Sequence, residues 1–306
     1  MTAFLFPGQG SQQPGMGRDF HERSPAAREI FERAAAASES GFLDRIFCSN
    51  QDALNQTQLA QPALLVVEIA IATHLQARGL HPSVCAGHSL GEIPALVAAG
   101  ACAFEDALRF TRERARLMSE NVPEGGMAAV LGLSPQDIAP CLPDEVQIAN
   151  YNGPEQTIIT GRTDALAAAI AALHAAGAKR IIPLKVSGPF HSQYMKPAAD
   201  EMRRVLADVP FRAPTTPFIS SVTGREEADP ERIRQLLAEQ LVLPVRWTDV
   251  MRRIGPGDAV EIGPGNVLRG LARRMDGAPR VHAAGTWEQT EALVAQPVQD
   301  GEASKT

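Results

Sequence analysis

The sequence predicts an α/β protein with a largely parallel sheet and an inserted ferredoxin-like subdomain. First, an apolar strand, a sharp glycine-containing turn and a helical pattern follow one another at residues 83–99, an order that indicates α/β layering. Second, residues 127–184 have the order strand, helix, strand, strand, helix, strand, which is that of the split βαβ unit. Third, 306 residues of which 44% are hydrophobic supply enough apolar side chains for a large core.

The first 124 residues alternate short apolar runs with helical patterns. We expect a buried strand at residues 3–6, ended by Pro7-Gly8-Gln9-Gly10, and a second buried strand at residues 83–87. Helical patterns cover residues 26–37, 62–77, 90–99 and 104–121. Residues 1–124 therefore form the first part of a core unit that continues at residue 189.

The middle of the chain, residues 125–188, predicts the small ferredoxin-like subdomain. Strands are expected at residues 127–131, 146–150, 156–160 and 179–184. Ser134 and Pro135 have the residue types of an N-cap and a first helical position, and Thr163 is expected to cap a longer Ala-rich helix that extends to Ala176. Glycine- and proline-containing segments flank the unit on both sides, as expected of an insertion.

The rest of the chain completes the core unit at residues 189–288. Helices are expected at residues 195–209, 231–241 and 266–275, and strands at residues 218–222 and 259–262. Residues 289–306 are expected to form a C-terminal tail, which is polar and loose from about Gln296.

Charge and composition exclude several classes of partner. Lys and Arg total 29 and Asp and Glu total 35, so the formal net charge is −6. Binding to nucleic acids depends mainly on clustered cations, and an aromatic content of 5% offers few platforms for stacked bases. We therefore expect no nucleic-acid partner and no anionic membrane partner.

Neither a metal centre nor a secreted protein is expected. The four cysteines lie far apart, with no CxxC pair and no histidine close enough to suggest a zinc site: Cys48, Cys85, Cys102 and Cys141. The N-terminal MTAFLFPGQG lacks the basic start of a signal peptide. The longest apolar stretch, residues 63–72, is too short to span a membrane and contains Glu68. The sequence thus predicts a soluble, cytoplasmic protein.

The segment Gly87-His88-Ser89-Leu90-Gly91 matches the G-x-S-x-G nucleophile elbow. It follows an apolar strand and precedes a helical pattern, the context that gives this short pattern its meaning. Both glycines are needed, because a side chain at either flank would clash in so tight a turn. The turn would expose the Ser89 hydroxyl and leave the Leu90 N–H free to stabilise an oxyanion. The alternative is that Ser89 is an ordinary helix N-cap.

A serine nucleophile needs a general base, and seven histidines are available. His88 adjoins Ser89, but neighbouring side chains at such a turn usually diverge. His191 lies in an irregular segment between two regular elements, where functional residues concentrate. His191 is therefore the candidate base, and the alternative is a loop histidine exposed to solvent.

Five motifs occur in order along the chain: FPGQGSQ at 6–12, QPAL at 61–64, GHSLGE at 87–92, GPFHS at 188–192 and EIGPG at 261–265. Together they closely resemble the malonyl-CoA:acyl carrier protein transacylases. That family includes the fatty-acid synthesis enzyme and the free-standing acyltransferases that serve polyketide synthases. The resemblance extends from Phe4 to about Met275, and it implies a hydrolase-like large subdomain with a ferredoxin-like insertion.

The resemblance also implies roles for individual residues. Ser89 would be the acylated nucleophile and His191 its general base. Gln9 and Leu90 would supply backbone N–H groups to an oxyanion hole, and the glycines flanking Gln9 would let the main chain approach the thioester oxygen. Gln240 would orient the histidine through its main-chain carbonyl, so that the machinery is a dyad without a carboxylate. Gln61 and Asn152 match recurrent family positions near the pocket.

Two further residues bear on the substrate. The resemblance places the carboxylate-binding arginine at Arg114, whose guanidinium could meet a malonyl carboxylate with two parallel charge-assisted hydrogen bonds. Taken alone, Arg114 belongs to a basic run that would ordinarily be a solvated helix face. Phe190 resembles the family variant in which a bulky ring leaves little room for a 2-methyl branch, which favours malonyl over methylmalonyl.

The expected function is transfer of a malonyl group from malonyl-CoA to the phosphopantetheine thiol of an acyl carrier protein, through a malonyl-serine intermediate. No metal or other cofactor is needed, and a monomer is expected. One alternative is a proofreading hydrolase or thioesterase that acts on acyl carrier proteins, and another is a non-catalytic docking subunit. The segment at 150–154 and the GPFH loop look more like the free-standing polyketide acyltransferases. Basic residues expected to meet an acidic carrier protein are Arg109, Arg112, Arg116, Lys179, Arg180, Lys196, Arg273 and Arg274.

Overall fold

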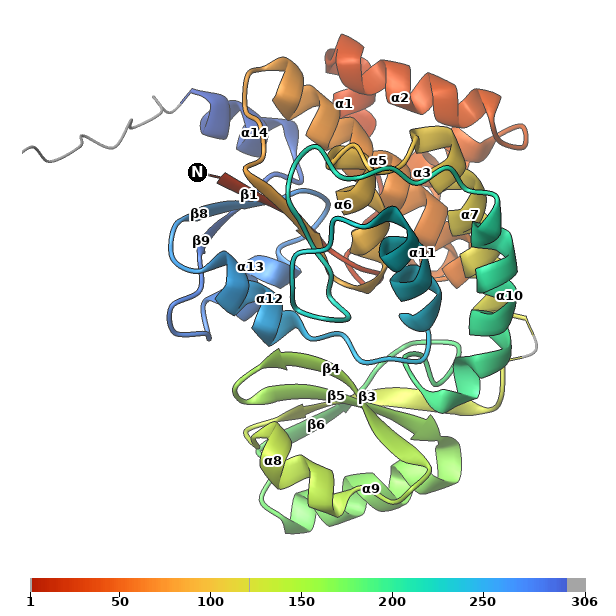
Figure 1. Ribbon diagram of the computed structural model, residues 1–306, viewed down its shortest axis with the longest axis vertical. Coiled ribbons are helices and arrows are strands. Elements are labelled where there is room, and N and C mark those ends of the chain that lie inside the picture. The colour runs from red at the N-terminus through yellow and green to blue at the C-terminus, as the bar shows by residue number, and fades with distance from the viewer. Residues whose placement is uncertain (1, 121, 296–306) are drawn as a thin grey trace, which may run out of the picture.

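The computed structural model of the chain describes residues 2–120 and 122–295. Its strands are β1 Thr2–Phe6, β2 Val84–Gly87, β3 Gly125–Leu131, β4 Val146–Gly153, β5 Gln156–Arg162, β6 Arg180–Pro183, β7 Phe218–Ile219, β8 Asp258–Glu261 and β9 Arg280–Ala283. Its α-helices are α1 Arg18–Arg23, α2 Pro25–Ala36, α3 Phe42–Cys48, α4 Gln51–Leu54, α5 Thr57–Ala77, α6 Glu92–Ala98, α7 Phe104–Leu117, α8 Pro135–Ile138, α9 Thr163–Ala175, α10 Lys196–Ala207, α11 Pro230–Glu239, α12 Trp247–Ile254, α13 Val267–Ala272 and α14 Trp287–Val294. Figure 1 shows how these elements are arranged.

The large sheet is parallel throughout and has the order β7-β2-β1-β8-β9. Successive residues of a strand point to opposite faces, and β1 shows this in its packing. Phe4 and Phe6 belong to the main core with α5, α6 and α7, whereas Ala3 and Leu5 belong to a second core with α12 and α13. Both faces are therefore covered, as a parallel sheet requires, and the predicted α/β class is confirmed.

Helix α5 crosses the centre of the main core and begins earlier than the sequence suggested. The expected start at Pro62 is wrong, because the helix begins at Thr57 and holds Pro62 in its second turn. By length and apolarity alone α5 could cross a membrane, but 89% of its most apolar window is buried inside the protein. Helix α5 is thus a core helix, and its early start brings Thr57 and Gln61 to the site described below.

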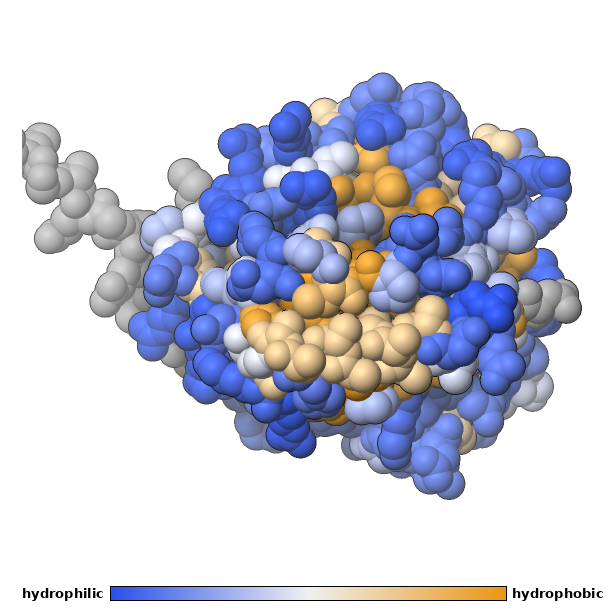
Figure 2. All heavy atoms as spheres, turned by 90° about the horizontal axis from the view of Figure 1, so that it is seen from below, coloured by the Kyte–Doolittle hydropathy of each residue, from blue (hydrophilic) through white to orange (hydrophobic). Residues whose placement is uncertain are grey.

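The small sheet is antiparallel and has the order β4-β5-β3-β6. Numbered within the unit, this is the order 2-3-1-4 of the ferredoxin-like fold that the sequence predicted. Helices α8 and α9 cover one face of the sheet and enclose a separate core. The outer face of α9 consists of exposed alanines, which form the apolar patch in Figure 2: Ala167, Ala168, Ala171, Ala172 and Ala175.

Backbone hydrogen bonds tie strand β4 to the large unit. The Tyr151 N–H donates to the Val245 carbonyl at 2.8 Å, and the Val245 N–H donates to the Ala149 carbonyl at 2.8 Å. The Thr248 hydroxyl at the start of α12 donates to the Tyr151 carbonyl at 3.0 Å. These bonds fix the rim of the small sheet against the carboxyl end of the large one, which is where the candidate site lies.

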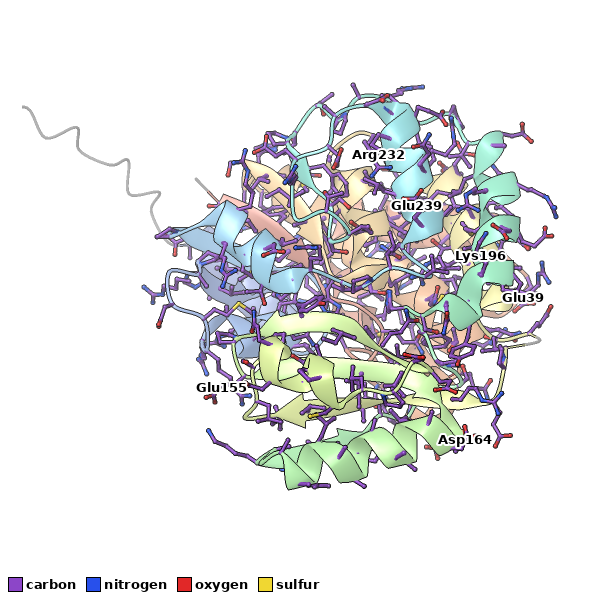
Figure 3. All side chains as sticks on the ribbon, turned by 60° about the horizontal axis from the view of Figure 1, so that its bottom comes forward. Glu39, Glu155, Asp164, Lys196, Arg232 and Glu239 are labelled. Atoms are coloured by element: carbon purple, nitrogen blue, oxygen red, sulfur yellow. The ribbon has the colours of Figure 1, made fainter. Side chains whose placement is uncertain are left out.

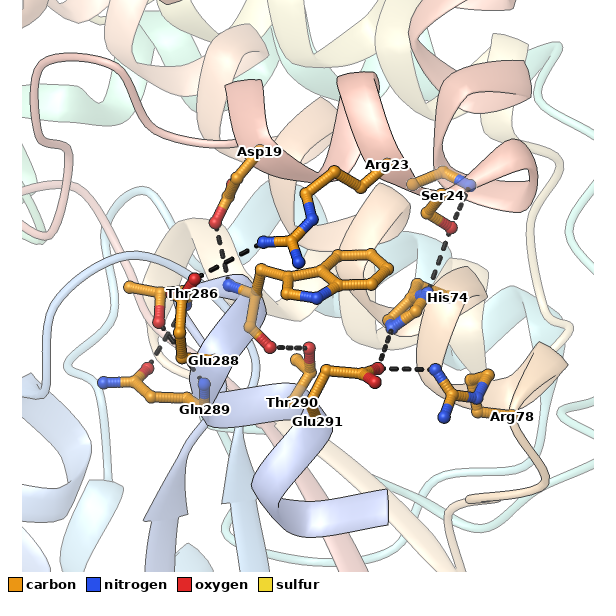
Figure 4. A network of polar contacts seen from close by, with 12 residues as sticks. Asp19, Arg23, Ser24, His74, Arg78, Thr286, Glu288, Gln289, Thr290 and Glu291 are labelled. Carbon is orange, nitrogen blue, oxygen red and sulfur yellow. Dashed lines mark hydrogen bonds and ion pairs between the residues drawn. The ribbon is translucent and has the colours of Figure 1, made fainter. Parts of the chain in front are cut away.

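The C-terminal segment corrects the predicted tail at residues 289–306. Residues Trp287–Val294 form helix α14, which begins with a capping box between Thr286 and Gln289. The Trp287 ring lies 4.8 Å from the His74 ring, and the Trp287 backbone N–H donates to Asp19 at 2.7 Å. Figure 4 shows the polar contacts around this helix, with Asp19 and His74 labelled. The tryptophan anchors the helix to α1 and α5, so residues 289–294 belong to the packed core unit and not to a tail. The loose tail expected from Gln296 lies outside the described residues.

Several other elements differ from the expectation. Helices α1, α3, α4 and α12 and strand β9 were not expected, because each is short and the sequence offers no long periodic run there. The expected strand at 218–222 shortens to Phe218–Ile219. The expected helix at 104–121 ends at Leu117, and Asn121 lies outside the described residues.

Candidate active site

The nucleophile elbow joins β2 to α6 through one turn of 3₁₀-helix, Ser89–Gly91. A Cβ on Gly87 would lie 1.9 Å from the Gly91 carbonyl, and a Cβ on Gly91 would lie 2.1 Å from the Phe6 carbonyl. The expected need for both glycines is confirmed. Ser89 itself has φ 53°, a left-handed conformation that is strained for a residue with a side chain. The turn thereby points the Ser89 hydroxyl away from the sheet.

His191 meets Ser89 although the two residues are 102 positions apart. The Ser89 Oγ lies 2.8 Å from His191 Nε2. On the other side of the ring, Nδ1 lies 2.9 Å from the Gln240 carbonyl and 3.1 Å from the Leu243 carbonyl. Carbonyl oxygens only accept, so Nδ1 carries the proton and Nε2 is left to accept the Ser89 proton. The pair has the geometry of a nucleophile and its base.

The imidazole of His191 is only 5% exposed and lies beside a fixed positive charge. Burial, and then the nearby guanidinium of Arg114, lower the pKa of His191 to about 4. The ring is therefore neutral at physiological pH and free to accept a proton. His88 takes another part: its Nε2 donates to Asn152 Oδ1 at 2.8 Å, and its ring packs against Trp247.

The loop Gly8-Gln9-Gly10 lies against the elbow. A Cβ on Gly8 would lie 2.6 Å from the His88 carbonyl, so the close approach requires a glycine. Gln9 and Leu90 both line the cavity beside Ser89. Among the described residues, neither the Gln9 N–H nor the Leu90 N–H donates a hydrogen bond. Both amides are therefore available to an oxygen in the cavity, as an oxyanion hole requires.

Arg114 lies in the cavity wall and not on the solvated face of α7. Its side chain is 2% exposed. Nη1 donates to Gln61 Oε1 at 2.8 Å, and Nη2 donates to Gln240 Oε1 at 2.8 Å and lies 3.5 Å from Ser89 Oγ. Burial lowers the pKa of Arg114 to about 10, so the guanidinium stays charged at neutral pH. Its direct partners are neutral amides, which leaves the positive charge available to an anion.

Gln240 does more than the sequence suggested. Its main-chain carbonyl accepts from His191, while its fully buried side chain bonds three other groups. Nε2 donates to the Ser89 carbonyl at 3.0 Å and to Glu92 Oε2, and Oε1 accepts from Arg114. Glu92, which the sequence analysis did not single out, is 1% exposed. The sequence feature that could have drawn attention to Glu92 is that it is the one acidic residue at the start of an otherwise apolar helix, α6.

A cavity of about 400 Å³ joins these groups and opens between the two subdomains. The large unit contributes the elbow, the Gln9 loop and Arg114, and the small sheet contributes Asn150, Asn152 and Ile158. Phe190, buried directly before the base, also lines it. Among the residues described, no group of three or more His, Cys, Asp or Glu side chains is placed to hold a metal ion.

A family model described as an acyl transferase domain matches residues 3–302. The chain belongs to the acyl transferase domain family. It is 41% identical over 285 residues to the malonyl CoA-acyl carrier protein transacylase of Bacillus subtilis, covering 90% of each sequence. It is 42% identical over 284 residues to the protein of the same name in Escherichia coli K12, covering 89% of this chain and 92% of that one.

Solved structures of the family resemble the whole fold. An acyl-carrier-protein S-malonyltransferase from Bartonella henselae superposes with a TM-score of 0.90 at 40% identity, over 96% of this chain and 98% of that one. A malonyl-transacylase solved with the acyl carrier protein of a type II PKS superposes with a TM-score of 0.91 at 37% identity, over 96% and 98%. The protein is thus an acyltransferase by family and has the layered fold of its relatives.

Proposed function

We propose that the protein transfers a malonyl group from malonyl-CoA to the phosphopantetheine thiol of an acyl carrier protein. The observation that carries this proposal is the buried guanidinium of Arg114, 3.5 Å from the hydroxyl of a serine that is bonded to a neutral histidine. A neutral acyl group would leave the cavity side of that cation without an anion, whereas a malonyl group brings a carboxylate to it. Relatives named as malonyl transacylases support the same substrate.

The reaction proceeds in two half-reactions. His191 Nε2 accepts the Ser89 proton as Oγ attacks the thioester carbonyl carbon, and the Gln9 and Leu90 amides hold the oxyanion. The carbon–sulfur bond then breaks, the coenzyme A sulfur takes the proton from His191, and a malonyl-serine ester remains. In the second half-reaction the carrier-protein thiol gives its proton to His191 and attacks the ester. The proton returns to Ser89 as the ester bond breaks.

The partner expected from the sequence is an acyl carrier protein, of fatty-acid or of polyketide synthesis, and a monomer in the cytoplasm is part of the same proposal. Among the described residues, four of the eight basic residues expected at the docking surface form ion pairs: Arg109, Arg116, Lys179 and Lys196. Lys196 pairs with Asp200 at 2.7 Å, and Lys179 pairs with Glu155 at 3.3 Å; Figure 3 labels Lys196 and Glu155 on the surface. Exposed pairs of this kind are weak, so they do not prevent docking.

Intact-mass measurement tests the proposal. The protein is incubated with malonyl-CoA, methylmalonyl-CoA, acetyl-CoA or a longer acyl-CoA, before and after addition of holo carrier protein. We expect a malonyl adduct that is absent in Ser89→Ala and passes to the carrier protein, with a smaller methylmalonyl adduct because the Phe190 ring fills the cavity wall. An adduct lost to water indicates a hydrolase, and the absence of any adduct indicates a docking subunit.

A further inference from the structure

The guanidinium of Arg114 is held by neutral amides whose own orientation must be fixed. A glutamine amide has an oxygen that accepts and a nitrogen that donates, and rotation by 180° exchanges them at little cost in shape. In the structure, Gln240 Oε1 accepts from Arg114 and Nε2 faces the opposite side. Rotation would turn two N–H donors toward the guanidinium and release it. Something behind Gln240 must therefore exclude the rotated amide.

Glu92 occupies that position. Its Oε2 accepts from Gln240 Nε2, and its Oε1 accepts from the Ser221 backbone N–H. An ionised carboxylate has acceptors only, so it rejects the rotated amide, whose oxygen would face its own oxygen. The Ser89 carbonyl, at 3.0 Å from Nε2, acts in the same direction.

We propose that Glu92 is a positioning residue for acyl-group selection: it fixes the Gln240 amide so that the amide oxygen holds Arg114 beside Ser89. Glu92 touches neither the substrate nor the reacting atoms. It acts indirectly, by fixing which end of the Gln240 amide faces Arg114. The consequence for selection rests on the proposed malonyl transfer, whereas the effect on Arg114 does not.

Charge adds to this effect. Burial raises the pKa of Glu92 to about 7, while hydrogen bonds from Ser221, Ser220 and Gln240 oppose the rise. The acceptor-only carboxylate therefore predominates above about pH 7, and the assays below are run at about pH 8. The negative charge of Glu92 in turn raises the pKa of Arg114 against the effect of burial. Glu92 is thus the carboxylate that balances the guanidinium from behind Gln240, without occupying the face that the substrate would use.

The test is Glu92→Gln, which keeps the shape but has a single acceptor oxygen. If that oxygen keeps the Ser221 N–H, its amino group faces Gln240 Nε2 and drives the rotation. We expect kcat/KM for malonyl-CoA to fall about 10- to 100-fold, mostly through KM, and that for acetyl-CoA to change less than about threefold. Side-chain NMR of the free protein should show altered Gln240 amide and Arg114 guanidinium signals.

A matched control is Glu261→Gln. Glu261 is also fully buried and accepts two backbone N–H groups, from Leu268 and Arg269, but it has no contact with Gln240. We expect this variant to lose stability and to keep the malonyl-to-acetyl ratio. If Glu92→Gln does not fold, Glu92→Asp takes its place, because its shorter carboxylate cannot reach both donors.

The outcomes separate the two proposals. If Glu92→Gln leaves the malonyl-to-acetyl ratio of kcat/KM unchanged, whether both values fall equally or neither falls, the positioning role of Glu92 is overturned. If the wild-type protein loads no malonyl group, the proposed function fails and the NMR comparison decides alone: unchanged Arg114 signals in Glu92→Gln overturn the positioning role, and changed signals support it.

Discussion

Replacing Arg114 with alanine tests whether the buried guanidinium selects the acyl group. The side chain is 2% exposed, and Nη2 lies 3.5 Å from Ser89 Oγ, so an acyl group on Ser89 would extend past the guanidinium. A malonyl carboxylate there would accept two charge-assisted hydrogen bonds, each worth about 1.5–3 kcal/mol. Their sum, about 3–6 kcal/mol, corresponds to a loss of about 10²- to 10⁴-fold in kcat/KM for malonyl-CoA.

The same substitution should act differently on a neutral acyl group. Acetyl-CoA brings no anion to the substrate side of the guanidinium, so removing the cation should not slow acetyl loading. The assay is a rapid-quench measurement of the acyl-serine adduct by intact mass, with each thioester. Arg114→Lys should recover only part of the malonyl rate, because an ammonium keeps the charge but lacks the planar fork.

Arg116→Ala provides the matched control on the same helix. Arg116 lies on the exposed face of α7 and pairs with Glu113 at 3.0 Å and Glu120 at 2.7 Å. Surface pairs of this kind contribute about 0–1 kcal/mol, so selectivity should not change. A malonyl preference that stays within about tenfold of the wild-type value in Arg114→Ala would refute the role assigned to the guanidinium.

Three further predictions follow from burial and backbone geometry. Gly91→Ala should lower the free energy of unfolding by about 3 kcal/mol or more, because its Cβ would lie 2.1 Å from the Phe6 carbonyl. Urea unfolding measures this loss, and a smaller loss would contradict the geometry. Serine acylation by acetyl-CoA, which does not depend on Glu92, should stay constant from neutral pH down to about pH 5 and fall below it. The reason is that the proposed base must be deprotonated and the pKa of His191 is lowered to about 4; a midpoint near 6.5 would contradict this. Glu68→Gln should remove a pH dependence of stability, because burial raises the pKa of Glu68 well above 4.5. Above pH 4.5 the unfolded chain loses that proton first, so wild-type stability relative to the variant should fall as the pH rises. The slope is at most about 1.4 kcal/mol per pH unit and holds until the folded carboxyl itself ionises; urea unfolding over a pH series from 4.5 upward measures it.

Periodicity and turn chemistry predicted the framework of the protein. The strand before the elbow, the two glycines and the following helix are adjacent in sequence, so local rules apply to them. The ferredoxin-like unit was also visible, because its strand and helix order is local and Ser134 caps α8 as expected. The expected cap Thr163 is wrong: it is the first residue of α9, and Arg162 stands at the N-cap without a side-chain hydrogen bond. The prediction missed short elements such as α12 and misplaced helix boundaries such as the start of α5 at Thr57, because tertiary packing overrides local preference there.

The contacts of the site could not be derived from local pattern. Ser89 and His191 are 102 residues apart and Gln240 and Glu92 are 148 apart, and no periodicity links such positions. Family resemblance suggested the roles of Ser89, His191 and Arg114 but not that of Glu92. The sequence could not have predicted that the Leu243 carbonyl also contacts His191, because every residue carries a main-chain carbonyl.

Backbone strain coincides with the reacting pair. In the part of the chain that the structure describes, Ser89 and His191 are the two non-glycine residues with positive φ, at 53° and 57°. Such conformations are costly and persist only where the surroundings determine them. At Ser89 the surroundings are the packed glycines of the elbow, and at His191 they are the two carbonyls that hold Nδ1. Propensity opposes both conformations, so the fold imposes them on the two residues that the proposed function makes nucleophile and base.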